Sequence, residues 1–130
     1  MNEIEIGSVG VQAGQLARMA YKSGVYVGEV VEFNGARALM KTLAVLKHPE
    51  QGDLHHPYDP DVPMFHQRRA LSHTEKVNVP TRELQPFAGA VPEYRESLLR
   101  ALDEEWNRLD RLKRWAEQGI RHLDELRGEY

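Results

Sequence analysis

The pattern of hydrophobic and polar positions changes twice along the chain. Residues 9–47 are apolar and rich in β-branched and aromatic side chains, which is typical of strands. Residues 48–92 are polar and contain all seven prolines. Residues 93–130 contain no proline and are dense in Leu, Glu and Arg, which favour helix. The pattern therefore predicts a β-sheet, an irregular segment and a helical segment, in that order.

The first region predicts a three-stranded antiparallel meander. Residues 15–20 form the first strand, and residues 25–33, "VYVGEVVEF", form the second. Asn34-Gly35 is a two-residue hairpin signal because both residue types tolerate a positive φ. Residues 36–46, "ARALMKTLAVL", favour helix by propensity, which is a weak indicator. A strand that follows a hairpin turn lies directly beside the preceding strand and can pair with it. We therefore predict a third strand there.

Further strands are expected around residues 67–73 and 76–79. Short antiparallel strands that are linked by hairpins suggest a small barrel or a half-open sheet. The predicted fold class is thus mostly β with a C-terminal α-helical segment. Residues 1–90 would form the small barrel, with a loop rich in His and Pro at 47–66, and residues 91–130 would form a helical segment packed on it.

The C-terminal segment shows the period of an amphipathic helix, because its apolar residues recur at steps of three and four. These residues are Leu98, Leu102, Trp106, Leu109, Leu112, Ala116, Ile120, Leu123 and Leu126. A single helix of this length is uncommon in a globular domain, so we predict a break between Asn107 and Arg114 and a helical hairpin. We expect most of the leucines to pack on the sheet. A partner helix, or a second copy of the chain in a homodimer, would cover any remaining apolar face.

Composition narrows the function classes. The chain has 130 residues, 41% of them hydrophobic, a net charge of −3 and no cysteine. It is long enough for one domain with a modest core, and its charge does not suit a protein that binds nucleic acid through overall charge. Disulfides and thiolate sites are excluded. The N-terminal residues do not resemble a signal peptide, and no apolar run approaches the roughly 20 residues of a membrane-spanning helix. We expect a cytoplasmic protein.

The segment from residue 46 to 73, "LKHPEQGDLHHPYDPDVPMFHQRRALSH", holds five of the six histidines. A metal site with Asp53 is one interpretation, but no two of these histidines have the i,i+4 spacing of a helical metal-binding pair. A catalytic interpretation pairs Asp53 with His55 or Asp61 with His66, although no nucleophile or phosphate-binding motif accompanies them. We predict no catalytic residue, no metal and no cofactor.

A third interpretation is a stiff docking loop. Each of the X-Pro steps in "HHPYDPDVP" favours an extended backbone, so the segment should be ordered rather than flexible. A stiff loop with polar tips loses little entropy on binding, which suits a docking surface. The residues that we predict to bind a partner are His48, Gln51, Asp53, His55, His66, Arg68 and Arg69.

An alternative function is binding of RNA or single-stranded nucleic acid by the small barrel. Arg68, Arg69 and Lys47 would form a basic patch beside the loop. The aromatic residues that would stack on bases are Tyr21, Tyr26, Phe33, Tyr58 and Phe65. Residues 1–90 contain nine basic and ten acidic residues, so this part of the chain is not basic overall, which makes this function the less favoured one.

Two long stretches carry a family resemblance. "YKSGVYVGEVVE" followed by "VLKHPEQGDLHHPYDPDVPMFHQRRAL" resembles the kinase-associated protein B family of spore-forming Gram-positive bacteria, also called kinase-associated lipoprotein B. The similarity continues through "NVPTRELQPFAGAVPEYRESLLRAL" to the C-terminal residues and covers about residues 17–130. It implies an SH3-like barrel followed by a helical segment. It also implies a non-enzymatic regulatory protein that supports a sensor histidine kinase of the sporulation phosphorelay.

The sequence departs from this family at two points. The word lipoprotein implies a lipid-modified cysteine, and the sequence has no cysteine, so membrane proximity would come only through a partner. An acidic, helix-breaking step is also expected before the last helix, where this chain has "NRLDRLKRW". The second departure bears directly on the predicted helix break.

Overall fold

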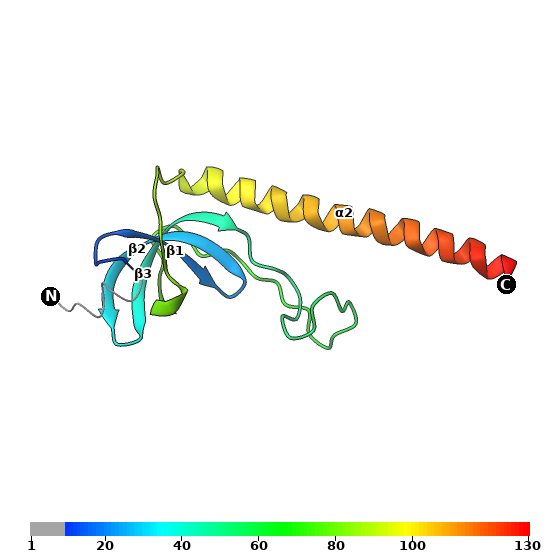
Figure 1. The fold of residues 1–130 in the computed structure, drawn as a ribbon, viewed down its shortest axis with the longest axis horizontal. Coiled ribbons are helices and arrows are strands. Elements are labelled where there is room, and N and C mark those ends of the chain that lie inside the picture. The colour runs from blue at the N-terminus through cyan, green and yellow to red at the C-terminus, as the bar shows by residue number, and fades with distance from the viewer. Residues whose placement is uncertain (1–9) are drawn as a thin grey trace.

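The structure is a computed structural model that describes residues 10–130. It consists of an antiparallel sheet from which one long helix projects (Figure 1). The mostly β class with a C-terminal helix is therefore confirmed. The N-terminal residues that we predicted not to be a signal peptide lie outside the described residues, as does the start of the 1–90 domain. The elements are β1 (Leu16–Tyr21), β2 (Gly24–Asn34), β3 (Arg37–Lys47), β4 (Lys76–Pro80), the 3₁₀ helix η1 (Thr81–Glu83), β5 (Gln85–Pro86) and α2 (Tyr94–Glu129).

The sheet has the strand order β4-β3-β2-β1-β5, and all of its pairings are antiparallel. β4 and β5 are the two edges, yet the chain passes from one to the other through η1 and Leu84 alone. A flat sheet of five strands would be about 19 Å wide, so the sheet must curve strongly for so short a segment to join its edges. Among the described residues no ladder joins β4 to β5. The sheet is open, and closure into an SH3-like barrel stays a prediction.

The three strands of the predicted meander are confirmed, but the hairpin turn lies one residue later than predicted. Asn34 pairs with Arg37, so the two turn residues are Gly35 and Ala36. Gly35 has a φ of 63°. A glycine with positive φ at the first central position is what a type II′ turn needs, and Asn34 remains in the strand.

One of the other strand predictions is wrong, and one strand was not predicted. The segment 67–73 contains no strand, because its polar groups bond to the neighbouring loop instead, as described below. β5 is only two residues long and was not predicted. β4 agrees with the prediction for 76–79 to within one residue.

The core lies on the concave face of the sheet. β3 shows why a strand prevails over helical propensity in residues 36–46: its buried positions alternate with more exposed ones, as on a half-buried strand. The buried hydrophobic residues that form one cluster are Val11, Ala17, Met19, Tyr26, Val30, Ala38, Met40, Val45, Leu71, Val77, Val79, Leu84 and Ala101. Only Ala101 comes from the helix.

α2 is one unbroken helix of 36 residues, so the predicted break between Asn107 and Arg114 is wrong. Glu93 is its N-cap and accepts a hydrogen bond from the backbone N–H of Glu96 at 2.7 Å. The proposed break region contains no proline or glycine, and Arg114 forms an ion pair with Asp110 at 3.0 Å. Ion pairs between residues four apart support a continuous helix.

The start of α2 is fixed to the sheet by polar contacts. β4 pairs with β3 only as far as Lys41, so Val45 lies beyond the reach of that strand. Ser97 takes its place: its buried Oγ accepts a hydrogen bond from the backbone N–H of Val45 at 2.9 Å and donates one to the carbonyl of Tyr94 at 2.7 Å. The Tyr94 hydroxyl in turn donates to the carbonyl of Leu71.

Only the first turns of α2 contact the sheet. Every residue from Arg111 to Tyr130 is exposed, and the helix runs past the edge of the sheet into solvent (Figure 1). The expectation that most of the leucines pack on the sheet is therefore wrong for the second half of the helix, because an unbroken helix cannot turn back. Within the described residues, no helix combines the length and the apolar character needed to cross a membrane.

We predict that Ser97→Ala lowers the free energy of unfolding by about 1–3 kcal/mol, because it leaves the buried N–H of Val45 without an acceptor. Urea unfolding followed by circular dichroism measures the loss. Arg100→Ala is the control, since Arg100 is exposed on the same helix. Equal stability of the two variants would show that the Ser97 bond does not hold the helix in place.

Candidate functional site

The loop rich in His and Pro is closed at its base by a polar clamp. The Gln51 side chain donates to the carbonyl of Arg68 at 2.9 Å and accepts from the backbone N–H of Arg68 at 2.8 Å. The Arg68 guanidinium donates to the carbonyl of Glu50, and the N–H of Gly52 donates to the carbonyl of His66, both at 2.8 Å. These four bonds hold the two ends of the loop together, so residues 53–65 leave the body from a fixed base.

Gly52 has a structural role in this clamp. Its φ is 94°, and a Cβ added there would lie 2.8 Å from a ring carbon of Phe65. Both the backbone conformation and the space favour glycine alone. The ring of Phe65 therefore packs directly against the backbone where the loop begins.

The beginning of the loop is organised by Asp53. Its carboxylate accepts from the backbone N–H of His55 at 2.8 Å and lies 3.1 Å from Nδ1 of His56. The His55 N–H contributes most, followed by His56, to holding the pKa of Asp53 below its ordinary value. Asp53 thus stays ionised and shapes an Asx turn.

Arg108 ties the loop to α2. Its guanidinium makes a bidentate pair with Glu105, with both N–O distances 2.8 Å. It also donates to the Tyr58 hydroxyl at 3.3 Å and lies 3.8 Å from a carboxylate oxygen of Glu50. The hydrogen bonds from Arg108 lower the pKa of Glu105, and the same pair raises the pKa of Arg108. One side chain of the helix thereby reaches both the base and the tip of the loop.

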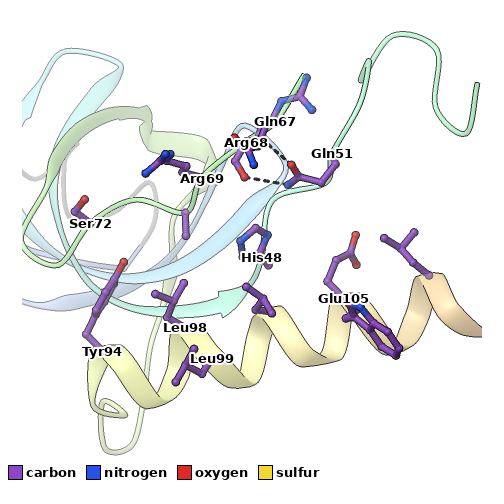
Figure 2. A pocket seen from close by; sticks show the side chains of 14 residues that line it. His48, Gln51, Gln67, Arg68, Arg69, Ser72, Tyr94, Leu98, Leu99 and Glu105 are labelled. Carbon is purple, nitrogen blue, oxygen red and sulfur yellow. Dashed lines mark hydrogen bonds between the residues drawn. The ribbon is translucent and has the colours of Figure 1, made fainter. Parts of the chain in front are cut away.

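A groove of about 650 Å³ separates the segment 67–72 from the first turns of α2 (Figure 2). Its apolar wall comes from the helix, and its polar wall comes from the clamp and the residues that follow it. We call this the docking groove. Its lining residues are His48, Gln51, Gln67, Arg68, Arg69, Ala70, Ser72, Tyr94, Leu98, Leu99, Leu102, Glu105, Trp106 and Leu109.

The structure brings together four of the seven residues that we predicted to bind a partner. His48, Gln51, Arg68 and Arg69 all line the docking groove.

The other three predicted residues lie elsewhere on the loop. Asp53 lines a smaller cavity of about 170 Å³ between the loop and α2. His55 and His66 are exposed and line neither of these cavities. The seven residues therefore do not form one site.

Sequence analysis missed the helical half of the groove. Leu98, Leu102, Trp106 and Leu109 were recognised as an apolar face, but not as the wall opposite Arg68. One signal in the sequence could have indicated this wall: the C-terminal segment has more apolar positions than a small sheet can cover. The ion pair of Arg108 with Glu105 gave no signal that distinguished it from other pairs three residues apart on the helix.

The aromatic residues do not form one stacking surface for nucleic acid. Tyr26 is buried in the core, and Tyr21 and Phe33 pack against that core. Tyr58 and Phe65 lie on the loop instead. This separation gives no support to the nucleic-acid interpretation. Over residues 10–130, no three His, Asp or Glu side chains are grouped closely enough to hold a metal ion.

Comparison with known proteins gives consistent matches. The family model for kinase associated protein B matches residues 21–130. Kinase-associated lipoprotein B of Bacillus subtilis (strain 168) is 42% identical over 120 residues, which cover 92% of this chain and 94% of that protein. A crystal structure of kinase-associated protein B from Bacillus cereus is 33% identical, with a TM-score of 0.64 over 77% of this chain and 78% of the other.

We predict that Gln51→Ala opens the base of the loop. Amide exchange at Arg68 should accelerate by about tenfold, because its N–H loses its acceptor. Hydrogen–deuterium exchange by NMR measures this. Gln67→Ala is the matched control, since Gln67 is an exposed amide on the same segment. Unchanged exchange in Gln51→Ala would mean that the clamp does not close the loop.

A second prediction concerns pH. The pKa of Glu105 is lower in the folded chain than its ordinary value of 4.5, so the ionised carboxylate stabilises the fold above that value. This contribution is lost as the pH falls through the folded pKa. Glu105→Gln should therefore lower the free energy of unfolding by about 1–2 kcal/mol at pH 7.

The difference between wild type and Glu105→Gln should shrink when the pH is taken from 7 to 3. Urea unfolding across this range measures it, with Glu104→Gln as the control because Glu104 is exposed. A difference that stays constant with pH would contradict the stabilising role of the ion pair.

Proposed function

The chain belongs to the kinase-associated protein B family, and we propose that it is a non-enzymatic protein that binds a kinase. The family name describes association with a kinase. The resemblance in the loop and sheet sequences leads us further, to a sensor histidine kinase of the sporulation phosphorelay as the partner. The protein would act in the cytoplasm and lie near the membrane only through that kinase.

The observation that supports this proposal is the docking groove itself. One wall offers leucines and Trp106, which is 60% exposed, and the other offers cationic side chains. The Arg68 guanidinium donates to a backbone carbonyl, and within residues 10–130 neither Arg68 nor Arg69 forms an ion pair with a carboxylate. Two guanidinium groups beside an apolar wall are suited to an amphipathic segment with acidic side chains.

The groove is held in its open shape before any partner binds. Gln51 and Arg68 fix the loop side, and Ser97 fixes the helix side. A partner would therefore lose little free energy to reorganisation of this protein. The kinase segment that we propose is an amphipathic helix, such as those in the dimerisation bundle of a histidine kinase, with its apolar face on Leu98, Leu102 and Trp106.

The part of the loop outside the groove is a second proposed contact. Asp53, His55 and His66 lie outside the groove on the same rigid loop, and Asp53 holds the turn that presents His55. We propose that these side chains touch the kinase after the groove has bound it. The double variant Asp53→Asn/His55→Ala should then weaken kinase binding less than a change in the groove does.

We predict that Arg69→Glu weakens binding to the purified cytoplasmic part of the kinase by at least about tenfold, because it places a carboxylate where an acidic segment binds. Isothermal titration calorimetry measures the affinity. Arg82→Glu is the matched control: the charge change is the same, and the 80% exposed side chain of Arg82 lies outside the groove.

Three outcomes contradict the proposal. In the first, wild-type protein binds none of the sensor kinases that feed the phosphorelay. In the second, Arg69→Glu and Arg82→Glu weaken binding equally, so that overall charge and not the groove decides affinity. Retained binding by both variants would also exclude the groove as the site.

A further inference from the structure

α2 presents an apolar stripe that nothing covers from Leu112 onward within residues 10–130. Its members recur at steps of 3, 4, 3, 4 and 3, which is the seam spacing of a coiled coil. The stripe consists of Leu109, Leu112, Ala116, Gly119, Leu123 and Leu126, with Trp115 and Ile120 at its borders. Leu123 is 64% exposed and Trp115 is 77% exposed.

This stripe continues the face by which α2 packs on the sheet. Ala101 and Glu105 are buried against the body, and Leu109 follows at the next step of four. The helix then passes the edge of the sheet (Figure 1). The spacing of its apolar residues continues on the same face as far as Leu126. A helical segment of about 20 residues with no tertiary contact is only marginally stable in water, and most helical stability comes from packing of an apolar face. We therefore expect another helix to pack on this face.

The order of large and small side chains along the stripe is nearly the same from Leu109 to Leu126 as from Leu126 to Leu109. Leu109 corresponds to Leu126, Leu112 to Leu123, and the small residue Ala116 to the small residue Gly119. A helix with this symmetry is complementary to a second copy that runs in the opposite direction. We propose that the protein forms a homodimer in which the 109–126 segments of two copies pair antiparallel.

In this pairing each seam layer contains one residue from each half of the stripe. Leucine meets leucine in the outer layers, and Ala116 meets Gly119 in the centre. Nothing lies within 4 Å of a Cβ built at Gly119, so a partner backbone has free access there. Small residues at the centre allow two helices to approach closely, and Trp115 and Ile120 would cover the borders of that contact.

Charges at the borders of the stripe favour the same direction. Arg108 and Lys113 lie at the borders of its first half, and Arg127 and Glu129 lie at the borders of its second half. Antiparallel pairing places Arg108 near Glu129 of the second copy, and it places the alkyl chain of Lys113 near Ile120 of that copy. Parallel pairing would instead place Arg108 of one copy beside Lys113 of the other, and these two positive charges repel each other.

The dimer would have an elongated shape. The paired segments span 18 residues, or about 27 Å, and the two sheets lie at opposite ends. The proposal does not rest on the kinase: the stripe shares Leu109 with the docking groove, but the variants that test pairing change Leu112 and Leu123, which do not line the groove. Dimerisation and kinase binding can therefore succeed or fail separately.

The first experiment measures the mass of the full chain by sedimentation equilibrium. Wild type is expected to be a dimer, and Leu112→Gln/Leu123→Gln is expected to be a monomer at the same concentration. Gln is a good helix former, so circular dichroism should show that the variant keeps the helix next to the sheet. Arg121→Gln, on the opposite face of the helix, is the control and should remain a dimer.

The second experiment fixes the direction. The chain has no cysteine, so Leu112→Cys and Leu123→Cys introduce single thiols. Under oxidation an equal mixture of the two variants should form disulfide-linked dimers, whereas either variant alone should not. Monomeric wild type at the highest soluble concentration overturns the proposal, and so does self-linking of Leu112→Cys as efficient as that of the mixture, which indicates parallel pairing.

Discussion

The hydrogen bond between Ser97 and the backbone of Val45 fixes the start of α2 on the sheet. The positions of the docking groove and of the free apolar stripe depend on it. β3 extends beyond the last residue that pairs with β4, so β4 supplies no acceptor for the N–H of Val45 at this edge of the sheet. Ser97 meets that need, and Ala101 places the helix against the core in the next turn. Because an α-helix is stiff, fixing its first two turns also fixes the direction of the remaining seven or so. Both the docking groove and the free stripe follow from that direction.

The loop is the second fixed wall of the groove, and its rigidity comes from paired polar groups rather than from a hydrophobic core. Gln51 satisfies both backbone groups of Arg68, as a neighbouring strand would. Arg108 then joins the loop tip to the helix, so the two walls support each other. A surface built in this way needs little reorganisation on binding, which suits the proposed association with a kinase.

Sequence patterns were sufficient where a residue's neighbours lie close in the chain. The meander and the amphipathic face both follow from local rules, and the docking interpretation of the loop selected four residues that do line the groove. The same rules failed at the turn beside Gly35 and at the expected helix break. At the first, a shift of one residue changes the turn type. At the second, we expected a break because single helices of this length are uncommon. The helix continues because residues 107–114 contain no proline or glycine.

The sequence by itself determined the class of the fold, the family and the apolar periodicity of the last helix, because these depend on residue types and their spacing. Only the tertiary structure decided which part of that apolar face is buried, which lines the groove and which remains free. That division depends on where a hydrogen-bonding partner for Val45 happens to lie, 52 residues further along the chain. Contacts of such separation are set by the packing of the whole domain, and no local pattern contains them.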